Sequence, residues 1–463
     1  MTIDHDPDDQ LPRGGGYDDL ASLWAELDDL EASVAELASP ALSFLEDPIS
    51  RVFEKIKAFE PSVSVIGQIK AGKSTLLNAM IGQPDLLPSD VNPWTSVITA
   101  LHVNPRHRPR DTRALFRFFD AEEWDRLVAT GGRLGEMADR VGFENEADEI
   151  KSQVNKMRRT TEERFGDVFE ALLGNSHAFP TIDKQTIDRY ICYGDPDETG
   201  DGGTEGVFAD ITKLADLYIE RPDLPRGICL RDTPGVNDTF MMREQITLNA
   251  ISDSRVCIVV LSAHQALSTM DLALLRIICA VDAREVLIFV NRIDELIDPA
   301  GEEEKIRTSI RSTLAGLGIS DQIDIVFGSG YWANYAHGLL SGATMRPMYP
   351  RSLAALAQLE PAEDLENPSV LARVALENSG IYALHRAIAE RICEGPGKAI
   401  LADVRAEIAA IAEMSKTVVE TAQAAQSGGE AAPSGAAQLS GAAARALVDA
   451  VRDDTLERFD AAA

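Results

Sequence analysis

Hydrophobic residues near both ends of the chain recur at helical spacing. In residues 20–37 they lie three and four positions apart, and the pattern resumes in residues 42–59. Residues 401–418 carry the same narrow stripe. Such a stripe needs partner helices to cover it, so the pattern predicts an α-helical neck bundle built from segments far apart in the sequence. The alternative is that the first helices pack on a globular body alone.

The middle of the chain contains short, continuous apolar runs instead. Runs of this length, rich in β-branched residues and separated by helical sequence, are typical of the central parallel strands of an α/β fold. They lie at residues 63–66, 97–103, 228–230, 256–261, 286–290 and 323–327. The predicted fold class is therefore α/β, with a mostly parallel central sheet in addition to the helical neck bundle.

A glycine-rich loop joins the first predicted strand to a helix. A loop of this spacing wraps a diphosphate, because its glycines allow close approach and the N–H groups at the helix start point inward. In this arrangement Lys73 reaches the β- and γ-phosphates and Ser74 binds magnesium. An ordinary glycine-rich turn is the alternative, but the flanking strand and helix favour a nucleotide-binding P-loop. The loop consists of Gly67, Gln68, Ile69, Lys70, Ala71, Gly72, Lys73, Ser74 and Thr75.

Two later loops supply residues that a triphosphate site needs. Thr95 precedes the strand at 97–103 and is placed to close on magnesium and the γ-phosphate. Asp232 follows the run at 228–230 and can hold magnesium through a water molecule. Gly235 can offer its backbone N–H to the γ-phosphate, which makes this loop a sensor of that group. The sequence therefore predicts a Mg²⁺ site at Ser74, Thr95 and Asp232.

Residues 291–294, Asn-Arg-Ile-Asp, distinguish between bases. Asp294 can accept hydrogen bonds from both N1–H and N2–H of guanine, whereas adenine has no matching pair of donors. Asn291 is expected to tie this loop to the P-loop, and Arg292, where lysine is usual, to stack its guanidinium on the base. Ser329, in a Gly-Ser-Gly turn, is a weaker candidate for contact with the base. The expected ligand is GTP or GDP.

The rest of the chain divides around this nucleotide domain, which is expected at residues 61–396. The long separation between Thr95 and Asp232 predicts an insertion at about residues 113–206, largely helical with strand fragments, that ends in an acidic, glycine-rich loop. Residues 331–350 are expected to form a packed loop. The other predicted parts are a disordered leader at 1–16, neck helices at 17–60, 397–426 and 442–463, and a flexible linker at 427–441.

The composition of the chain indicates in which cellular compartment the protein works and which classes of binding partner it disfavours. The 463 residues are 45% hydrophobic, which is enough for a sizeable core, and the sequence shows neither a signal peptide nor a membrane span. A net charge of −31 opposes binding to nucleic acid or to anionic lipid headgroups, so membrane contact would need a local apolar or basic element. The five cysteines lie singly, without His partners at metal-ligand spacing. Reduced thiols in a cytoplasmic protein are therefore predicted.

Taken in order, these motifs resemble those of the dynamin superfamily of large GTPases. Bacterial dynamin-like proteins, relatives of mitofusins, are the most similar branch, on the basis of Lys70 in the P-loop and of residues 86–93, 236–238 and 379–381. The resemblance covers roughly residues 60–395. It implies a GTPase domain on a helical neck, hydrolysis of GTP, and a homodimer or higher homo-oligomer formed through GTPase domains. It also implies remodelling, tethering or fusion of membranes, from a peripheral position at the inner face of the cell membrane.

The end of the chain departs from this family pattern. Such proteins normally carry a long helical trunk with a lipid-binding tip, and no apolar tip is visible in this sequence. Two explanations are open: the helical trunk is naturally shortened, or the chain is an engineered fragment. In both, the linker at 427–441 stands where a trunk would be.

Hydrolysis is expected to proceed by in-line attack of water on the γ-phosphate. Val236 stands where small GTPases hold a water-orienting glutamine, so that role falls to the main chain near Thr95 and to the P-loop. Lys70 stands where other dimerising GTPases have a residue that helps to hold a monovalent cation. We expect its ammonium group to replace that cation; a solvated surface lysine is the alternative.

Two function classes remain open from the sequence. The first is a mechanochemical GTPase acting on membranes, and the second is a cytosolic GTP-dependent switch or scaffold acting on protein partners. A ribosome or RNA factor is disfavoured, because the chain is strongly acidic and lacks a basic domain.

Overall fold

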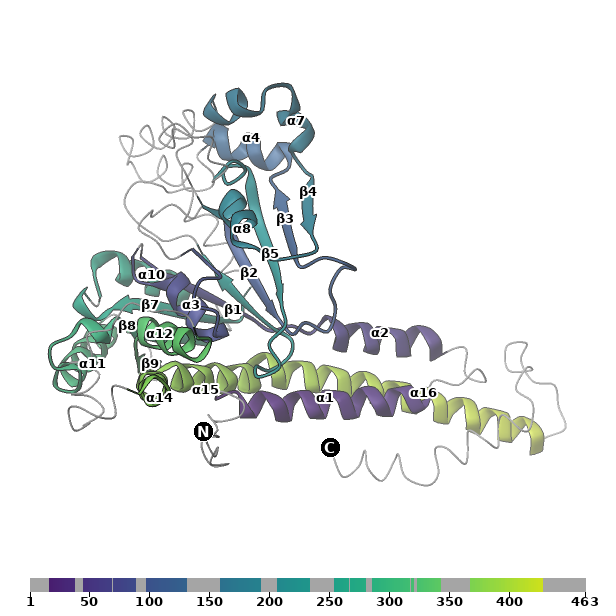
Figure 1. Cartoon of the computed structure of the whole chain (residues 1–463). Helices are drawn as coiled ribbons and strands as arrows, with labels where there is room; N and C mark the ends of the chain where they lie inside the picture. Colours follow the sequence, from purple (N-terminus) through teal and green to yellow (C-terminus); the bar gives the residue numbers. More distant parts are fainter. Residues whose placement is uncertain are drawn as a thin grey trace, which may run out of the picture. The chain divides into compact units, whose positions relative to one another are not determined.

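The computed structural model describes two units of the chain (Figure 1). The sheet unit comprises the chain up to Leu20 and Glu60–Ile392, and the helical unit comprises Ala21–Phe59 and the chain from Cys393. Described residues are 16–37, 45–68, 70–88, 97–130, 159–192, 206–233, 254–265, 267–279, 285–316, 318–319, 323–342 and 367–427. Most of the predicted leader and linker, and all of the last predicted helix at 442–463, lie outside them.

In the described part of the sheet unit, nine strands form one sheet in the order β4-β3-β5-β2-β6-β1-β7-β8-β9. Neighbours in the half from β6 to β9 are parallel, and their side chains are almost entirely buried. Burial on both faces explains their continuous apolar sequences and confirms the predicted α/β class with a mostly parallel sheet. The strands of this half are β6 (Ile228–Asp232), β1 (Ser62–Gly67), β7 (Val256–Ser262), β8 (Glu285–Asn291) and β9 (Asp324–Phe327).

The other half of the sheet is mixed. Strand β2 (Ile98–Val103) is antiparallel to β6 and parallel to β5 (Thr212–Ile219). Strands β3 (Ala114–Phe118) and β4 (Ser176–Phe179) continue it with antiparallel pairs. Stacked rings cover part of this half, among them those of Phe116 and Tyr190, whose centroids lie 4.2 Å apart.

The predicted insertion at 113–206 therefore extends the central sheet as well as adding helices. Its described helices are α4 (Ala121–Thr130), the short η2 (Gly166–Val168), α7 (Phe169–Leu172) and α8 (Lys184–Ile191). Figure 1 shows α4 and α7 at the end of β3 and β4. Strand β4 is short and has no buried residue, which leaves little apolar pattern to reveal it in the sequence.

Longer helices accompany the parallel half of the sheet. They are α3 (Lys73–Ile81), α10 (Thr269–Cys279), α11 (Pro299–Gly316), α12 (Gly330–Leu340), α14 (Pro368–Asn378) and α15 (Ile381–Ile392), with short η3 (Ala263–Gln265) and η4 (Ile293–Glu295) at strand ends. The prediction of a packed loop at 331–350 is wrong for residues 331–340, which belong to α12. The glycines in this stretch suggested a loop, but the residues form a helix. Ser329 caps this helix, and Trp332 and Tyr335 of the helix are buried.

The helical unit contains most of α1 (Asp18–Leu37), α2 (Glu46–Ala58) and α16 (Lys398–Ser427). Ion pairs join these helices: Lys55 Nζ lies 2.9 Å from Asp403 Oδ2, and Arg405 pairs with Glu26. Most of the buried apolar residues belong to the predicted stripes, and the predicted helical bundle is confirmed. They include Leu23, Leu27 and Val34 of α1, Ile49, Val52 and Ile56 of α2, and Val404, Ile408 and Ile411 of α16.

Between α15 and α16 the chain makes a single π-helical turn, Cys393–Gly397. Glycine and proline at positions 395–397 predict the end of a helix, and the structure shows that α16 begins directly afterwards, at Lys398. Because proline cannot donate a backbone hydrogen bond, a wider turn accommodates it without an intervening loop. None of the described helices combines the length and the apolar character that a membrane crossing requires.

Candidate functional site

The predicted nucleotide-binding residues that the structure describes meet at one edge of the sheet. Strands β6, β1, β7 and β8 are parallel, so their carboxyl ends lie together, with Val65 opposite Asp232 and Ser262 opposite Asn291. The P-loop follows β1 at the centre of this edge. The edge of an open α/β sheet beyond the strand ends is where such folds bind ligands.

The P-loop turns back over itself around Lys73. The Nζ atom of Lys73 donates to the carbonyl oxygens of Gly67 at 3.2 Å and Gln68 at 3.0 Å. Gly72 caps helix α3 with a φ of 88°, in the left-handed region that favours glycine. A Cβ atom at this position would lie 2.5 Å from Nδ2 of Asn291. A larger residue would therefore displace the loop of residues 291–294, here called the base loop.

Ser74 and Asp232 face each other at the start of α3. The hydroxyl of Ser74 donates to Oδ2 of Asp232 at 2.7 Å, and among the described residues Oδ1 of Asp232 is buried without a hydrogen-bond partner. Burial raises the pKa of Asp232, while the ammonium group of Lys73 acts in the opposite direction. A hydroxyl beside a buried carboxylate is a donor set that suits Mg²⁺, so these residues fit the expected metal.

Asn291 connects the base loop with the P-loop and with α12. Its Nδ2 donates to the carbonyl oxygen of Ala71 at 3.0 Å, and its Oδ1 accepts from the backbone N–H of Gly330 at 3.0 Å. The side chain is buried. One amide group therefore holds together three segments that are distant in the sequence.

Asp294 is held by a residue that the sequence marked only weakly. The hydroxyl of Ser329 donates to Oδ1 of Asp294 at 2.6 Å, and the same oxygen of Ser329 accepts from the N–H of Trp332 to cap α12. Burial raises the pKa of Asp294, and the hydrogen bond from Ser329 opposes that rise. Ser329 thus contacts the carboxylate through its side chain, and its predicted contact with the base stays a prediction.

Arg292 is anchored beside the P-loop. Its backbone φ is 71°, and its Nε donates to Oε1 of Glu295 at 2.8 Å. Its Nη1 donates to the carbonyl oxygen of Lys70 at 3.4 Å, and the other carboxylate oxygen of Glu295 lies 2.8 Å from Nε2 of His264. Glu295 and His264 have no motif of their own, so the sequence did not single them out.

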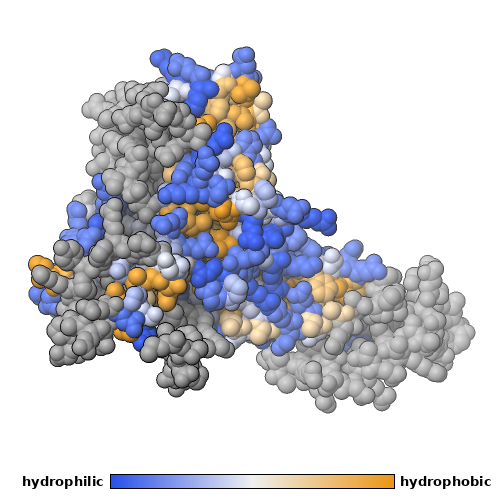
Figure 2. All heavy atoms as spheres, viewed as in Figure 1, coloured by the Kyte–Doolittle hydropathy of each residue, from blue (hydrophilic) through white to orange (hydrophobic). Residues whose placement is uncertain are grey.

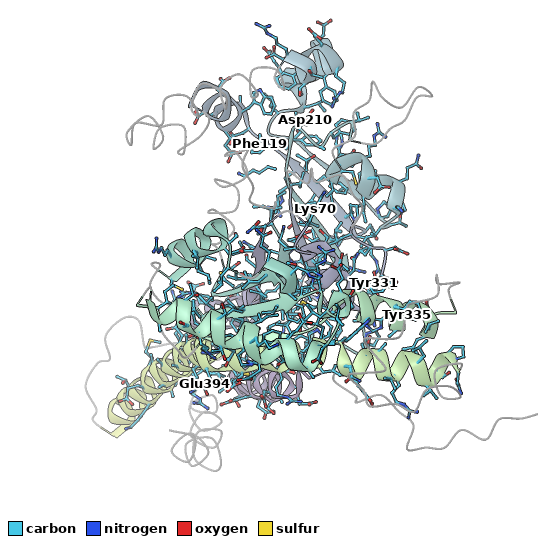
Figure 3. The ribbon with its side chains drawn as sticks, turned by 90° about the vertical axis from the view of Figure 1, so that its left-hand side faces the viewer. Lys70, Phe119, Asp210, Tyr331, Tyr335 and Glu394 are labelled. Atoms are coloured by element: carbon cyan, nitrogen blue, oxygen red, sulfur yellow. The ribbon has the colours of Figure 1, made fainter. Side chains whose placement is uncertain are left out.

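Lys70 lies at the exposed tip of the P-loop (Figure 3). Its φ of 66° places a residue with a side chain in the left-handed region, which costs about 1–2 kcal/mol relative to the right-handed conformation. Its carbonyl oxygen contacts Arg292, so the backbone here is held by the base loop.

Next to the P-loop the structure shows two interactions that the sequence did not predict: a hydrogen bond from Gln68 to Ser268 and a reciprocal cap at the start of α10. Gln68, the second residue of the P-loop, donates its side-chain amide to Ser268 Oγ. Ser268 and Asp271 cap α10 reciprocally, and a Ser-x-x-Asp spacing before an apolar helix is the sequence signal that could have revealed this. Tyr331 is half-exposed, and burial together with the nearby charge of Asp294 raises its pKa (Figure 3).

Three predicted site residues, Ile69, Thr95 and Gly235, lie outside the described residues, as does Val236. The described structure therefore brings together the P-loop, Asp232, the residues 291–294 and Ser329. The roles of Thr95 and Gly235 stay predictions.

Comparisons with known proteins agree with this arrangement. Residues 63–293 match the model Dynamin_N of the dynamin family. Dynamin-like protein 1 of Campylobacter jejuni is 22% identical over 326 residues, which cover 68% of this chain and 40% of that protein. The bacterial dynamin-like protein of Nostoc punctiforme is 25% identical over 244 residues, 52% of this chain and 26% of that protein.

A third relative is the clamp-binding protein CrfC of Escherichia coli, 24% identical over 323 residues, 67% of this chain and 42% of that protein. The chain thus spans less than half the length of each of these three relatives. The mitofusin-like branch stays a prediction.

Two similar solved structures come from work on an oligomerised bacterial dynamin pair in the long-range sensing and tethering of membranes. They match with TM-scores of 0.54 and 0.56 at 15% and 17% identity, covering 90% and 88% of this chain and 62% and 61% of theirs. At this identity they show a shared fold. The family match over residues 63–293 gives the identification: the chain belongs to the dynamin family.

Proposed function

We propose that the chain is a GTP-hydrolysing mechanoenzyme that dimerises through its GTPase units and tethers or remodels membranes. The proposal that the chain binds GTP rests on the hydrogen bonds that hold Asn291 and Asp294 in place. Asn291 binds the P-loop carbonyl of Ala71, and Asp294 is positioned by Ser329 to accept from guanine. Phosphate and guanine recognition are therefore built into one connected edge of the sheet.

The phosphate end would work through Lys73, Ser74 and Asp232. When GTP binds, its β- and γ-phosphates would replace the loop carbonyls that Lys73 now contacts. Ser74 would hold Mg²⁺ directly and Asp232 through water, and the ion would neutralise charge on the phosphates. The hydroxyl–carboxylate pair at 2.7 Å is the observation that supports this assignment.

Lys70 is proposed as the residue that stabilises developing charge during hydrolysis. It is exposed at the loop tip, and the contact of its carbonyl oxygen with Arg292 fixes the backbone while leaving the side chain outside that hydrogen bond. A cation supplied by the same chain would act as an arginine finger does, without a bound monovalent ion.

Dimerisation across this edge is supported by an apolar residue beside the base loop. Ile297 follows the 291–294 motif closely and is 94% exposed, an unusual position for a large aliphatic side chain. On the face shown in Figure 2, hydrophobic areas of the described residues are separated from one another by hydrophilic ones. A GTP-dependent dimer would cover Ile297.

Light scattering tests this proposal. Measured without nucleotide, with GDP and with a transition-state analogue, the mass should double only with the analogue, and Ile297→Asp should weaken that dimer. A mass that is unchanged in all three states would contradict the dimer.

Action on membranes is proposed from the similarity to the solved structures of a bacterial dynamin pair, which is described as sensing and tethering membranes. Sedimentation of the chain with liposomes and a non-hydrolysable GTP analogue tests it directly. Pelleting that requires the nucleotide would support membrane binding, and its absence would count against it.

A second candidate function is a GTP-dependent switch or scaffold for a protein partner. It is favoured by the similarity to a protein named for binding a clamp. GTP-dependent mass change without any liposome binding would favour this candidate over the first.

A further inference from the structure

A second group of polar side chains lies at the opposite edge of the same sheet. His102 of β2 and Cys229 of β6 are direct partners across the antiparallel ladder, and Glu60 stands two residues before β1, whose Ser62 is paired with Cys229. Because β1 is six residues long, this edge is about 16–20 Å from the P-loop along the strand. The group is therefore separate from the nucleotide site.

The three side chains converge on one point. One ligand atom each of Glu60, His102 and Cys229 lie within 4.8 Å of one another, and Nδ1 of His102 is 2.8 Å from Oε2 of Glu60. Cys229 is buried and the other two are half-buried. Within the described part of the chain, Oε1 of Glu60 is buried and has no hydrogen-bond partner.

The second nitrogen of His102 is held from the neighbouring strand. Nε2 lies 3.1 Å from Oδ1 of Asp216 on β5, a carboxylate that is buried and paired with Arg117 at 2.7 Å. The ring of Tyr218 stacks on the imidazole with centroids 4.9 Å apart. A histidine that binds a metal through one nitrogen usually donates its other N–H to a carboxylate in this way, which fixes the ring and its tautomer.

An imidazolium shared by Glu60 and Asp216 explains part of this geometry. The thiol of Cys229, at the same point, also hydrogen-bonds to the ring, but the orphaned Oε1 of Glu60 is left without a role. A divalent ion would use both, because thiolate sulfur, imidazole nitrogen and carboxylate oxygen are the ligands that Zn²⁺ takes in tetrahedral sites.

We propose that Glu60, His102 and Cys229 form a binding site for a divalent transition-metal ion of the zinc type, with water in the fourth position. Mg²⁺ is excluded by the sulfur and nitrogen ligands, since it prefers oxygen. The ion would join Glu60, the first residue of this stretch of the sheet unit, to β2 and β6. It would therefore stabilise the unit without taking part in hydrolysis.

The test is Zn²⁺ binding to the whole chain, with excess GDP and Mg²⁺ to fill the nucleotide site, by competition with a chromophoric chelator. Wild type should bind one ion more than Cys229→Ser, and Co²⁺ should give a thiolate-to-metal charge-transfer band only with Cys229 present. Cys257→Ser is the matched control, because Cys257 is also a buried cysteine on a central strand, and it should retain the ion.

Glu60→Gln provides a second variant, which avoids altering a central strand. It should weaken Zn²⁺ binding at least tenfold and reduce the rise in melting temperature that Zn²⁺ gives the wild type. Equal Zn²⁺ stoichiometry in wild type and Cys229→Ser, or no binding to wild type at micromolar Zn²⁺, would overturn the proposal and leave the imidazolium as the whole explanation.

Discussion

The two edges of the sheet use polar side chains in opposite ways. At the P-loop edge, Lys73 and Asn291 bind backbone carbonyls of loops, and we propose that Lys73 exchanges these partners for phosphates when a nucleotide binds. At the other edge, His102 binds Glu60 and Asp216, so side chains neutralise each other within the fold. We infer from this difference that the polar residues at the first edge serve nucleotide binding and those at the second edge serve stability, with or without a metal ion. Substitutions should therefore separate activity from stability.

Lys73→Ala should give the largest effect and sharpen this comparison. Removing the charge that contacts the phosphates should slow hydrolysis by about 100-fold or more, equivalent to roughly 3–4 kcal/mol in the transition state. Melting temperature should change little, because the hydrogen bonds of the ammonium to Gly67 and Gln68 lie within its own loop. Release of phosphate measures the hydrolysis rate, and thermal melting followed by circular dichroism measures stability. Comparable losses of hydrolysis rate and of stability would contradict the separation of activity from stability.

His102→Gln should give the converse result. Loss of the imidazole leaves the buried Asp216 and the half-buried Glu60 without their shared partner, and breaking such a partly buried group should cost about 3 kcal/mol of unfolding free energy. The affinity for GTP should stay within about twofold of wild type, since the site lies at the other edge. Urea unfolding and titration with a fluorescent guanine nucleotide provide the readouts. An unchanged unfolding midpoint would show that the imidazolium does not stabilise the sheet.

Asp294→Asn should change which base is bound. The carboxylate accepts two donors of guanine, and the amide would lose one acceptor and gain a donor, so GTP affinity should fall about 100-fold. Xanthosine triphosphate, with a carbonyl in place of the amino group, should then bind better than GTP. Ser329→Ala is the matched control, because it removes only the hydroxyl that holds Asp294 and should weaken GTP binding without altering base preference.

Lys70→Ala should give the smallest of these effects. If its ammonium stabilises the transition state, kcat should fall about tenfold while KM stays within about twofold. Wild-type turnover in sodium buffer should not respond to added potassium. A severalfold stimulation by potassium would show that a bound cation, and not Lys70, supplies the charge.

Much of the parallel half of the sheet was predictable, because strands buried on both faces have continuous apolar sequences and the P-loop and Asn291 follow two of them directly. Strand β4 was not, since a short strand with no buried residue carries no such pattern. Glu295, His264 and the group around His102 could not be predicted, because each depends on which strands become neighbours. The cysteines show this well: Cys229 has no histidine near it in sequence, yet it faces His102 across the sheet.

The amide of Asn291 has a consequence for how nucleotide leaves the domain. A planar group hydrogen-bonded to Ala71, in the proposed phosphate loop, and to Gly330, next to the proposed base site, would transmit a displacement of one loop to the other. Half-released states, with base free and phosphates held, should then be scarce. The kinetics of exchange should show a single phase, and partners of the protein would encounter it either loaded or empty.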